Sequence, residues 1–322
     1  MKKPIDIYLS GGGIKCAYQI TLLEKLINDK WFCDHFTIRN IYCVSFGCFV
    51  GYALIMDNLQ LLKKLFLAFD DNTLTKTFQL WGIHIPIIGK IINFISKIIW
   101  ILYGFFNKGY YTSTIGYKLI KALTNKSNES NIPKLNCYVF NVSKNKLELI
   151  NGMDKYFPDY VIASCSCWGL FKPIFINGSE YIDGGIIQVH PFVNLEQGGF
   201  GFGFGSGSGS SLETSPGFGS SPNPTQPIRL LLSTTNLDNL NNIKLDTGTN
   251  ILEYMSNIIS FLIDKNMFQI SRLWYGPNNI IVNYDPPIKL PHIINNDKIK
   301  QMFADGEVLG AQVLTQLKSK LL

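Results

Sequence analysis

Apolar and polar positions in the first part of the chain follow the order expected of alternating strands and helices. Residues 4 to 9 and residues 38 to 44 are mostly apolar over the length of a strand, which is typical of strands buried in a sheet. Between them, residues 14 to 28 carry apolar side chains at helical spacing, and residues 46 to 69 predict a second, long apolar helix. This order predicts an α/β fold with a mainly parallel central sheet.

The rest of the chain adds shorter elements to this pattern. The predicted strands are residues 134 to 142 and 146 to 150, as a hairpin or as two successive strands, a short pair within residues 171 to 182, and residues 228 to 234; the predicted helices are residues 250 to 272 and 296 to 320. Residues 198 to 227 are instead rich in Gly, Ser and Pro and cannot bury enough apolar surface to offset chain entropy. We therefore expect one domain over residues 1 to 322, with residues 198 to 227 as a disordered loop inserted in it.

Charge is distributed unevenly along the chain. Only 16% of the residues are charged, and the net charge is +6. Residues 60 to 126 hold nine Lys and two Asp, whereas the other residues hold 20 basic and 21 acidic side chains, so one segment carries the whole excess. Arg does not alternate with aromatic residues there, which argues against a nucleic acid as partner. An anionic membrane surface is the partner that this charge favours.

An apolar stretch, residues 83 to 106, lies within a basic segment, residues 60 to 110, and is long enough to span a bilayer. Lys90, Lys97 and Lys108 fall on one narrow stripe of a helical wheel, however, and each Lys would cost about 3 kcal/mol at the bilayer centre. A helix lying in the membrane interface with its lysines toward water avoids this cost. A cap helix over a cleft fits the same pattern, so cap, interface helix and true span are three alternatives.

The seven cysteines lack the spacing of a disulfide framework, and the N-terminus shows no secretory signal pattern. The sequence thus predicts thiols in a reducing compartment and a cytoplasmic protein that associates peripherally with membranes. Cys165 and Cys167 stand close together, but no matching His or Cys pair accompanies them, so we expect no metal. No cofactor is expected either.

Three glycines, Gly11, Gly12 and Gly13, stand between the first predicted strand and the first predicted helix. Backbone N–H groups at the start of a helix attract negative charge, and glycines let a ligand approach them closely. A dinucleotide-binding turn requires a further glycine where Cys16 stands, and the Gly-Lys-Ser/Thr of a nucleotide phosphate loop is absent. The turn therefore predicts an anion site of another kind.

Ser45 lies between the second predicted strand and the helix that follows it, in the stretch Cys43-Val44-Ser45-Phe46-Gly47. This is a Gly-x-Ser-x-Gly nucleophile elbow with Cys in place of the first Gly, and small residues are needed at both ends because the chain reverses sharply there. The turn projects the hydroxyl outward at the start of a helix, where the dipole favours the negative oxygen of an attacked carbonyl. Farther along, Asp183-Gly184-Gly185 places an acid at the end of a predicted strand, followed by residues without side chains.

Together and in this order, the three motifs resemble those of the patatin-like phospholipase family. Members of that family show a Gly-Gly-Gly-x-Arg-Gly turn, a Gly-x-Ser-x-Gly elbow and a later Asp-Gly-Gly or Asp-Gly-Ala, which correspond here to residues 11 to 16, 43 to 47 and 183 to 185. The last predicted helix is also similar to the closing helix of the family. The resemblance covers most of the chain except residues 60 to 130 and 198 to 227.

The resemblance implies a three-layer α/β/α fold and a phospholipase A-type lipid acyl hydrolase that works through an acyl-enzyme intermediate. Ser45 would attack the ester carbonyl, and Asp183 would take its proton directly and later activate the water that releases the acyl group. The implied oxyanion hole consists of Gly11, Gly12, Gly13 and Lys15, in which a donor typically contributes about 3 kcal/mol. The implied supporting glycines are Gly47, Gly184 and Gly185. A phospholipid or another lipid ester, and a membrane surface, are the implied partners.

The chain departs from the family pattern at several positions. Lys15 replaces the family Arg, which keeps the charge but loses the fork geometry. The other departures are Cys16 and Cys43 in place of Gly, Phe46 in place of a small residue, and Val189 and His190 before Pro191, where the family often has Asn. These substitutions leave the Ser-Asp dyad complete and bear on the rate.

Two other functions stay open. A Ser-His-Asp lipase of the α/β-hydrolase type fits the order Ser45, Asp183 and then His190 or His292, although the elbow of that fold normally follows several strands. A catalytically silent membrane-binding protein that keeps the fold fits the substitutions around the motifs. The sequence gives no indication of the oligomeric state.

Overall fold

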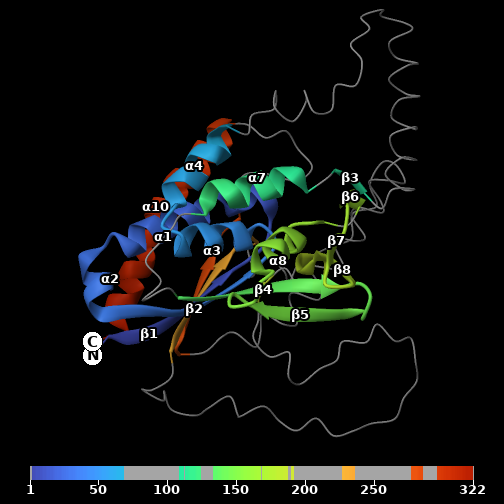
Figure 1. Cartoon of the computed structure of the whole chain (residues 1–322). Helices are drawn as coiled ribbons and strands as arrows, with labels where there is room; N and C mark the ends of the chain where they lie inside the picture. Colours follow the sequence, from blue (N-terminus) through green and yellow to red (C-terminus); the bar gives the residue numbers. More distant parts are fainter. Residues whose placement is uncertain are drawn as a thin grey trace, which may run out of the picture.

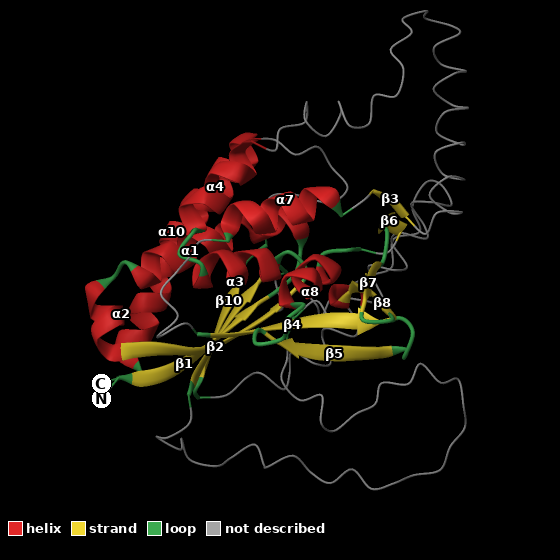
Figure 2. Cartoon of the chain, in the orientation of Figure 1, coloured by secondary structure: helices red, strands yellow, loops and turns green. Residues whose placement is uncertain are grey.

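The structure is a computed structural model, and it describes residues 2–68, 109–111, 113–124, 133–167, 169–187, 190–191, 227–235, 277–285 and 296–321. These residues form a mixed α/β architecture in which helices pack against a central, mostly parallel sheet, as Figure 1 and Figure 2 show. The predicted fold class is confirmed.

Eight strands among the described residues form the central sheet, in the order β10-β9-β1-β2-β4-β8-β7, with β5 paired to β4 off this path. The strands of this sheet are β1 (Lys3–Leu9), β2 (Phe36–Val44), β4 (Lys134–Asn141), β5 (Lys146–Asn151), β7 (Ile174–Ile176), β8 (Ser179–Asp183), β9 (Ile228–Ser233) and β10 (Asn279–Asn283). The run from β10 to β4 is parallel, whereas β5, β7 and β8 pair in antiparallel fashion. A separate pair joins β3 (Gly109–Tyr111) to β6 (Gly169–Phe171).

Helices gather on one face of the central sheet (Figure 2). They are α1 (Ala17–Ile27), α2 (Lys30–His35), α3 (Gly47–Ile55), α4 (Leu59–Ala68), α7 (Thr114–Leu123), α8 (Phe157–Ser164) and α10 (Asn296–Ser319), with short 3-10 turns η1 (Gly13–Cys16) and η3 (Gly184–Ile186). Alternate side chains of the strands, such as Ile7 of β1 and Leu230 of β9, belong to the same buried apolar core as the helices. The core therefore lies between the sheet and this helical layer.

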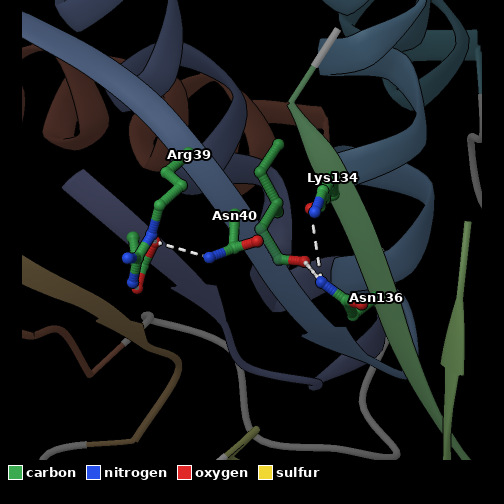
Figure 3. A network of polar contacts seen from close by, with 6 residues as sticks. Arg39, Asn40, Lys134 and Asn136 are labelled. Carbon is green, nitrogen blue, oxygen red and sulfur yellow. Dashed lines mark hydrogen bonds and ion pairs between the residues drawn. The ribbon is translucent and has the colours of Figure 1, made fainter. Parts of the chain in front are cut away.

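A polar network fixes β1, β2 and β4 against one another (Figure 3). Asp6 of β1 is 2% exposed and accepts two bonds from Arg39, at 3.0 and 2.6 Å, and one from Asn40 at 3.0 Å. Asn136 of β4 donates to the carbonyl of Lys134 at 3.3 Å and to a carbonyl of β2 at 3.4 Å. A buried carboxylate requires such partners, so these bonds set the register of the strands that carry the site.

The long strand β4 brings the ends of two other strands together. β2 runs parallel to β4 and ends at Val44, opposite Tyr138. β8 runs antiparallel to β4, and its last residue, Asp183, lies opposite Val139. β5 pairs with the other edge of β4, so β2 and β8 share one edge and their C-terminal ends face each other. Ser45 and Asp183 therefore meet, although 138 positions separate them in the sequence.

The predicted strands within the described residues are confirmed. The first predicted helix, over residues 14 to 28, is confirmed as η1 and α1, and the last, over residues 296 to 320, as α10. The prediction of one long helix over residues 46 to 69 is wrong, because the segment forms two helices, α3 and α4. Asp57 takes a left-handed conformation with φ of 54°, and the side chain of Asn58 donates to the carbonyl of Leu123 at 2.7 Å. Apolar side chains continue on both sides of this break, so the hydrophobic pattern does not indicate where α3 ends and α4 begins. The pattern also does not predict α2, α7, α8, β3, β6 or β10.

Three predicted segments lie largely or wholly outside the described residues. They are the helix over residues 250 to 272, the loop over residues 198 to 227, of which only the last residue is described, and the apolar stretch over residues 83 to 106. Of the helices that the structure does describe, none combines the length and the apolar character needed to cross a membrane.

Candidate active site

Ser45 lies at the turn from β2 into α3. Its φ of 53° falls in the left-handed region, which is uncommon for a residue with a side chain and clusters at functional turns. Gly47 begins α3, and a Cβ there would lie 2.7 Å from the carbonyl oxygen of Leu9 and 2.8 Å from that of Ser10. Only glycine lets α3 begin this close to the end of β1. The turn thus has the sharpness that a nucleophile elbow requires.

The hydroxyl of Ser45 donates a hydrogen bond to the carboxylate of Asp183, with Oγ and Oδ2 2.7 Å apart. The second carboxylate oxygen, Oδ1, accepts the backbone N–H of Gly185 at 2.7 Å. The chain leaves Asp183 through Gly184, where a Cβ would lie only 2.6 Å from the carbonyl oxygen of Tyr138. The structure brings together the two side chains that the sequence proposes as nucleophile and base.

Burial raises the pKa of the Asp183 carboxyl to about 7, while the hydrogen bonds from Ser45 and Gly185 act in the opposite direction. A carboxylate that is only 5% exposed loses its hydration, and this favours the protonated form. A group with such a pKa is half ionised near neutral pH, where a general base is most effective. The site therefore couples a hydroxyl to a carboxyl that can accept its proton.

The glycine turn, Gly11 to Gly13, lies directly against the elbow. A Cβ at Gly11 would be 2.7 Å from the Cβ of Ser45. Gly12 and Gly13 have φ values of 149° and 57°, which residues with side chains rarely adopt. Within the described residues, no acceptor is bonded to the three backbone N–H groups of this turn. The turn thus presents, beside Ser45, backbone N–H groups of the kind that bind anions.

The end of α8 holds the backbone of Ser45 from both sides. The N–H of Ser45 donates to Oγ of Ser164 at 2.9 Å, and its carbonyl accepts a bond from Sγ of Cys165 at 2.9 Å. Ser164 in turn donates to the carbonyl of Tyr138 at 2.6 Å. These bonds stabilise the left-handed conformation at Ser45. The sequence pattern does not assign Ser164 or Cys165 to the site of Ser45, since small residues at a helix end give only a weak local signal.

His190 is buried but is bonded elsewhere than to the Ser45–Asp183 pair. Its Nδ1 lies 2.5 Å from Oγ of Ser10, and its Nε2 lies 3.5 Å from Oγ of Ser233. Burial lowers the pKa of the ring to about 3, so the imidazole is neutral at neutral pH. In a Ser-His-Asp triad an imidazole stands between hydroxyl and carboxylate, whereas here these two groups touch directly.

The other histidine considered for a triad, His292, lies outside the described residues, as does Val189. The two cysteines that replace glycine both fit. Cys16 has a φ of −70° and donates its Sγ to the carbonyl of Ser10 at 3.4 Å. Cys43 is fully buried and donates to the carbonyl of Asn136 at 3.1 Å. Neither residue has a positive φ, so the thiols introduce no backbone strain.

Phe46 and Lys15 also have definite places. The ring of Phe46 packs against Phe49 and against Phe66 of α4, with centroids 5.1 Å apart in both pairs. Lys15 follows the glycine turn in η1, is half-buried, and its backbone N–H donates to the carbonyl of Gly12 at 3.1 Å. Phe46 is therefore held by the helical layer, and Lys15 stabilises the turn through its backbone.

No disulfide joins any two of the seven cysteines, all of which the structure describes. Over the same described ranges, no group of three or more His, Cys, Asp or Glu side chains is placed to hold a metal ion.

Comparison with known proteins adds an independent finding. The model of a family described as "Patatin-like phospholipase" matches residues 7–195. Similar solved structures include VipD from Legionella pneumophila, at 12% identity and a TM-score of 0.42, over 98% of this chain and 67% of that chain. They also include the ExoU–SpcU complex of the type III secretion system of Pseudomonas aeruginosa, at 11% identity and a TM-score of 0.27, over 99% of this chain and 60% of that chain. A search of curated proteins gives no match.

Proposed function

The chain belongs to the patatin-like phospholipase family, and from this premise we propose that it is a serine-dependent, phospholipase A-type acyl hydrolase of glycerophospholipids. The observation that carries the proposal is the 2.7 Å hydrogen bond from the Ser45 hydroxyl to the Asp183 carboxylate, beside the glycine turn. A hydroxyl bonded to a base, next to backbone donors, is the arrangement that acyl transfer requires.

The first step forms an acyl-enzyme. Oγ of Ser45 attacks the ester carbonyl while Oδ2 of Asp183 accepts the hydroxyl proton, and the former carbonyl oxygen becomes an oxyanion. N–H groups of Gly11 to Gly13 bind this oxyanion, with the positive charge of Lys15 nearby. When the intermediate collapses, the ester C–O bond breaks and Asp183 returns the proton to the leaving oxygen. A lysophospholipid departs, and the acyl group stays on Ser45.

The second step releases the fatty acid by the same chemistry in reverse order. Asp183, now ionised again, takes a proton from a water molecule, whose oxygen attacks the acyl carbonyl. The oxyanion forms in the same place and is bound by the same N–H groups. Collapse then breaks the bond to Oγ of Ser45, which recovers its proton from Asp183. One carboxyl therefore serves both half-reactions, and the pKa of about 7 suits both directions of proton transfer.

The test is hydrolysis of phospholipid vesicles by the purified chain. Vesicles of phosphatidylcholine with phosphatidylserine are incubated with the parent protein and with the Ser45→Ala and Asp183→Ala variants, and fatty acid and lysophospholipid are quantified by mass spectrometry. A fluorophosphonate probe is applied in parallel, because it reacts only with an activated serine. We expect product and labelling with the parent and neither with the two variants.

Matched controls use exposed residues of the same types. Ser319→Ala lies at the end of α10, and Asp34→Ala lies on α2 in an exposed ion pair with Lys30. Both controls should keep parental activity. A folded parent that neither labels nor releases fatty acid would favour the catalytically silent alternative. Hydrolysis that persists in Ser45→Ala would assign the nucleophile to another residue.

We further propose that residues 1 to 322 act as one catalytic unit at the cytoplasmic surface of anionic membranes. The lysine excess of residues 60 to 126 supports this choice of surface. Sedimentation with vesicles should increase with the phosphatidylserine fraction and decrease with added salt, because both change the attraction between lysines and lipid headgroups. Equal binding to neutral and anionic vesicles would contradict an electrostatic attachment.

A further inference from the structure

Ser10, the residue just before the glycine turn, is held at every polar group it has. Its N–H donates to the carbonyl of Leu232 at 3.2 Å. Its own carbonyl accepts Nε2 of Gln19 at 3.1 Å and Sγ of Cys16 at 3.4 Å. Its hydroxyl is bonded to Nδ1 of His190 at 2.5 Å. A fully buried residue with this many partners is a fixed support rather than a mobile loop residue.

The ring of His190 connects this support to the end of β9. Oγ of Ser233 already donates to the carbonyl of Thr235 at 2.5 Å, so toward His190 it can only accept. A proton on Nε2 of His190, 3.5 Å from this oxygen, suits the contact and leaves Nδ1 to accept the hydroxyl proton of Ser10. Burial lowers the ring pKa to about 3, which keeps the imidazole neutral near pH 7.

Next to Ser233, Thr234 extends the same support to the glycine turn. Oγ1 of Thr234 donates to the carbonyl of Gly11. The Thr234 side chain also fills the space beside Gly12, where a Cβ would lie 2.8 Å from its Oγ1. His190 and Thr234 thus hold the chain from one side, through Ser10 and Gly11 respectively.

Planarity of the peptide bond turns these contacts into control of the donors. In a trans peptide the C=O and the N–H that follows it point in opposite directions. Fixing the carbonyl of Ser10 therefore fixes the N–H of Gly11, and fixing the carbonyl of Gly11 fixes the N–H of Gly12. Glycine has no intrinsic preference that would hold these planes, so the orientation depends on the neighbours that bond to them.

We propose that His190 is a positioning residue that orients the backbone donors of the glycine turn through Ser10 and the end of β9. This inference rests on the proposed function and gives the histidine a role other than that of a triad base. Oxyanion stabilisation depends on donors fixed in advance at the right distance and angle. The Ser10 carbonyl is bonded by Gln19 and Cys16, so His190 acts through the Ser10 side chain and holds the residue from which the glycine turn starts. Loss of the His190 bond lets Ser10 shift, the Gly11 N–H loses its fixed position, and the transition state loses part of its stabilisation while substrate binding is retained.

Three variants of the full chain test this role: His190→Ala, His190→Asn and Ser10→Ala. In His190→Ala we expect kcat to fall about 10- to 100-fold with KM within about twofold, and labelling by the fluorophosphonate to slow by the same factor. His190→Asn should stay within about fivefold of the parent, because its amide lies close to the Nδ1 position and can bond the Ser10 hydroxyl. His35→Ala, an exposed histidine on α2, is the control that should change nothing.

Coupling between the partners gives the sharper readout. If His190 acts through Ser10, the double variant Ser10→Ala with His190→Ala should lose no more activity than the less active single variant. The reason is that both substitutions remove the same hydrogen bond. The pH midpoint of kcat/KM should stay near 7 in His190→Asn, since Asp183 supplies that titration. Thermal melting identifies any variant that does not fold. If His190→Ala does not fold, the activities of Ser10→Ala and His190→Asn decide whether His190 acts through Ser10.

Several outcomes would overturn the proposal. Unchanged kcat in folded His190→Ala would mean that the ring does not orient the turn. A folded His190→Asn as inactive as Asp183→Ala would make the histidine a base, and strictly additive losses in the double variant would break the link to Ser10. Failure of the proposed function would look different, because the parent itself would neither hydrolyse vesicles nor react with the probe. The positioning role would then be refuted as well, since there would be no reaction for His190 to assist.

Discussion

The two loops that meet at the candidate active site use their backbones in opposite ways. In the elbow, both backbone groups of Ser45 are bonded to the protein, the N–H to Ser164 and the carbonyl to Cys165. In the glycine turn, the carbonyls of Ser10 and Gly11 are bonded, whereas the N–H groups of the three glycines have no acceptor within the described residues. Each loop is held firmly, but only the glycine turn keeps backbone donors for a ligand.

The difference follows from what each loop presents. An elbow presents one side chain, so all of its backbone can be bonded to hold a strained residue in place. A donor loop presents its backbone, so it must be held through carbonyls and through neighbouring residues, and side chains must be absent where the ligand approaches. This candidate site therefore combines one strained serine with three glycines whose N–H groups have no acceptor within the described residues.

The largest expected effect on kcat comes from replacing Asp183, the proposed base. Asp183→Asn should lower kcat by about 10⁴-fold, because an amide cannot take the Ser45 proton. The same variant should be more stable than the parent at pH 8, because burial raises the carboxyl pKa in the folded state from 3.8 to about 7. Stability from this group is present below about pH 4 and is lost as pH rises toward 7, by on the order of 4 kcal/mol.

Urea denaturation at pH 5 and pH 8 checks the second half of that prediction. The parent should lose stability between the two pH values relative to Asp183→Asn. Parallel pH dependence in the two proteins would mean that the carboxyl is not desolvated in the folded state.

A smaller loss is expected from adding a side chain to the glycine turn. Gly11→Ala would place a Cβ 2.7 Å from the Cβ of Ser45, so turn and elbow must separate, and kcat should fall about 10²- to 10³-fold, comparable to the loss of one oxyanion donor. Gly13→Ala is the matched control, because no atom lies within 4 Å of the added Cβ. Its φ of 57° is unfavourable for alanine and should lower the free energy of unfolding by about 1 kcal/mol. Vesicle hydrolysis by the two variants should differ by at least about tenfold, and equal losses would contradict the contact between the loops.

A still smaller effect tests the anchoring of the elbow. Ser164→Ala removes the hydroxyl that accepts from the N–H of Ser45 and donates to the carbonyl of Tyr138, which should cost about 1 to 3 kcal/mol of unfolding free energy. Fluorophosphonate labelling should slow about 10- to 100-fold, since the strained serine loses a bond that holds it. Ser319→Ala, exposed on α10, should match the parent in both measurements. Normal labelling in a destabilised Ser164→Ala would reduce that residue to a purely structural role.

The smallest effect is the pH dependence of the parent. Because Asp183 must be ionised to accept a proton, kcat/KM should rise with pH, reach half its maximum near pH 7 and level off above it. Between pH 8 and pH 6 the expected decrease is about tenfold. A midpoint near pH 4 would place the carboxyl in a well-hydrated site and contradict its burial.

Local patterns were sufficient to predict the elements on which the site is built. The apolar strands, the glycines after β1 and the small residues around Ser45 all act over a few positions, and the structure contains the strands and turns that they predict. The break at Asp57 escaped prediction because apolar side chains continue on both sides of it. The contacts of Ser164 with Ser45 and of His190 with Ser10 were not predicted for a different reason, since each joins residues more than a hundred positions apart.

What the amino-acid sequence determined by itself is therefore local: a strand, a glycine turn and a helix, and a sharp turn that projects Ser45. Tertiary structure alone decided that Asp183 meets this serine, because β2 and β8 end opposite Tyr138 and Val139 on the same edge of β4. The physical reason is that a turn is specified by the conformations allowed to its own few residues, whereas the pairing of distant strands depends on which edges remain after the whole sheet has formed.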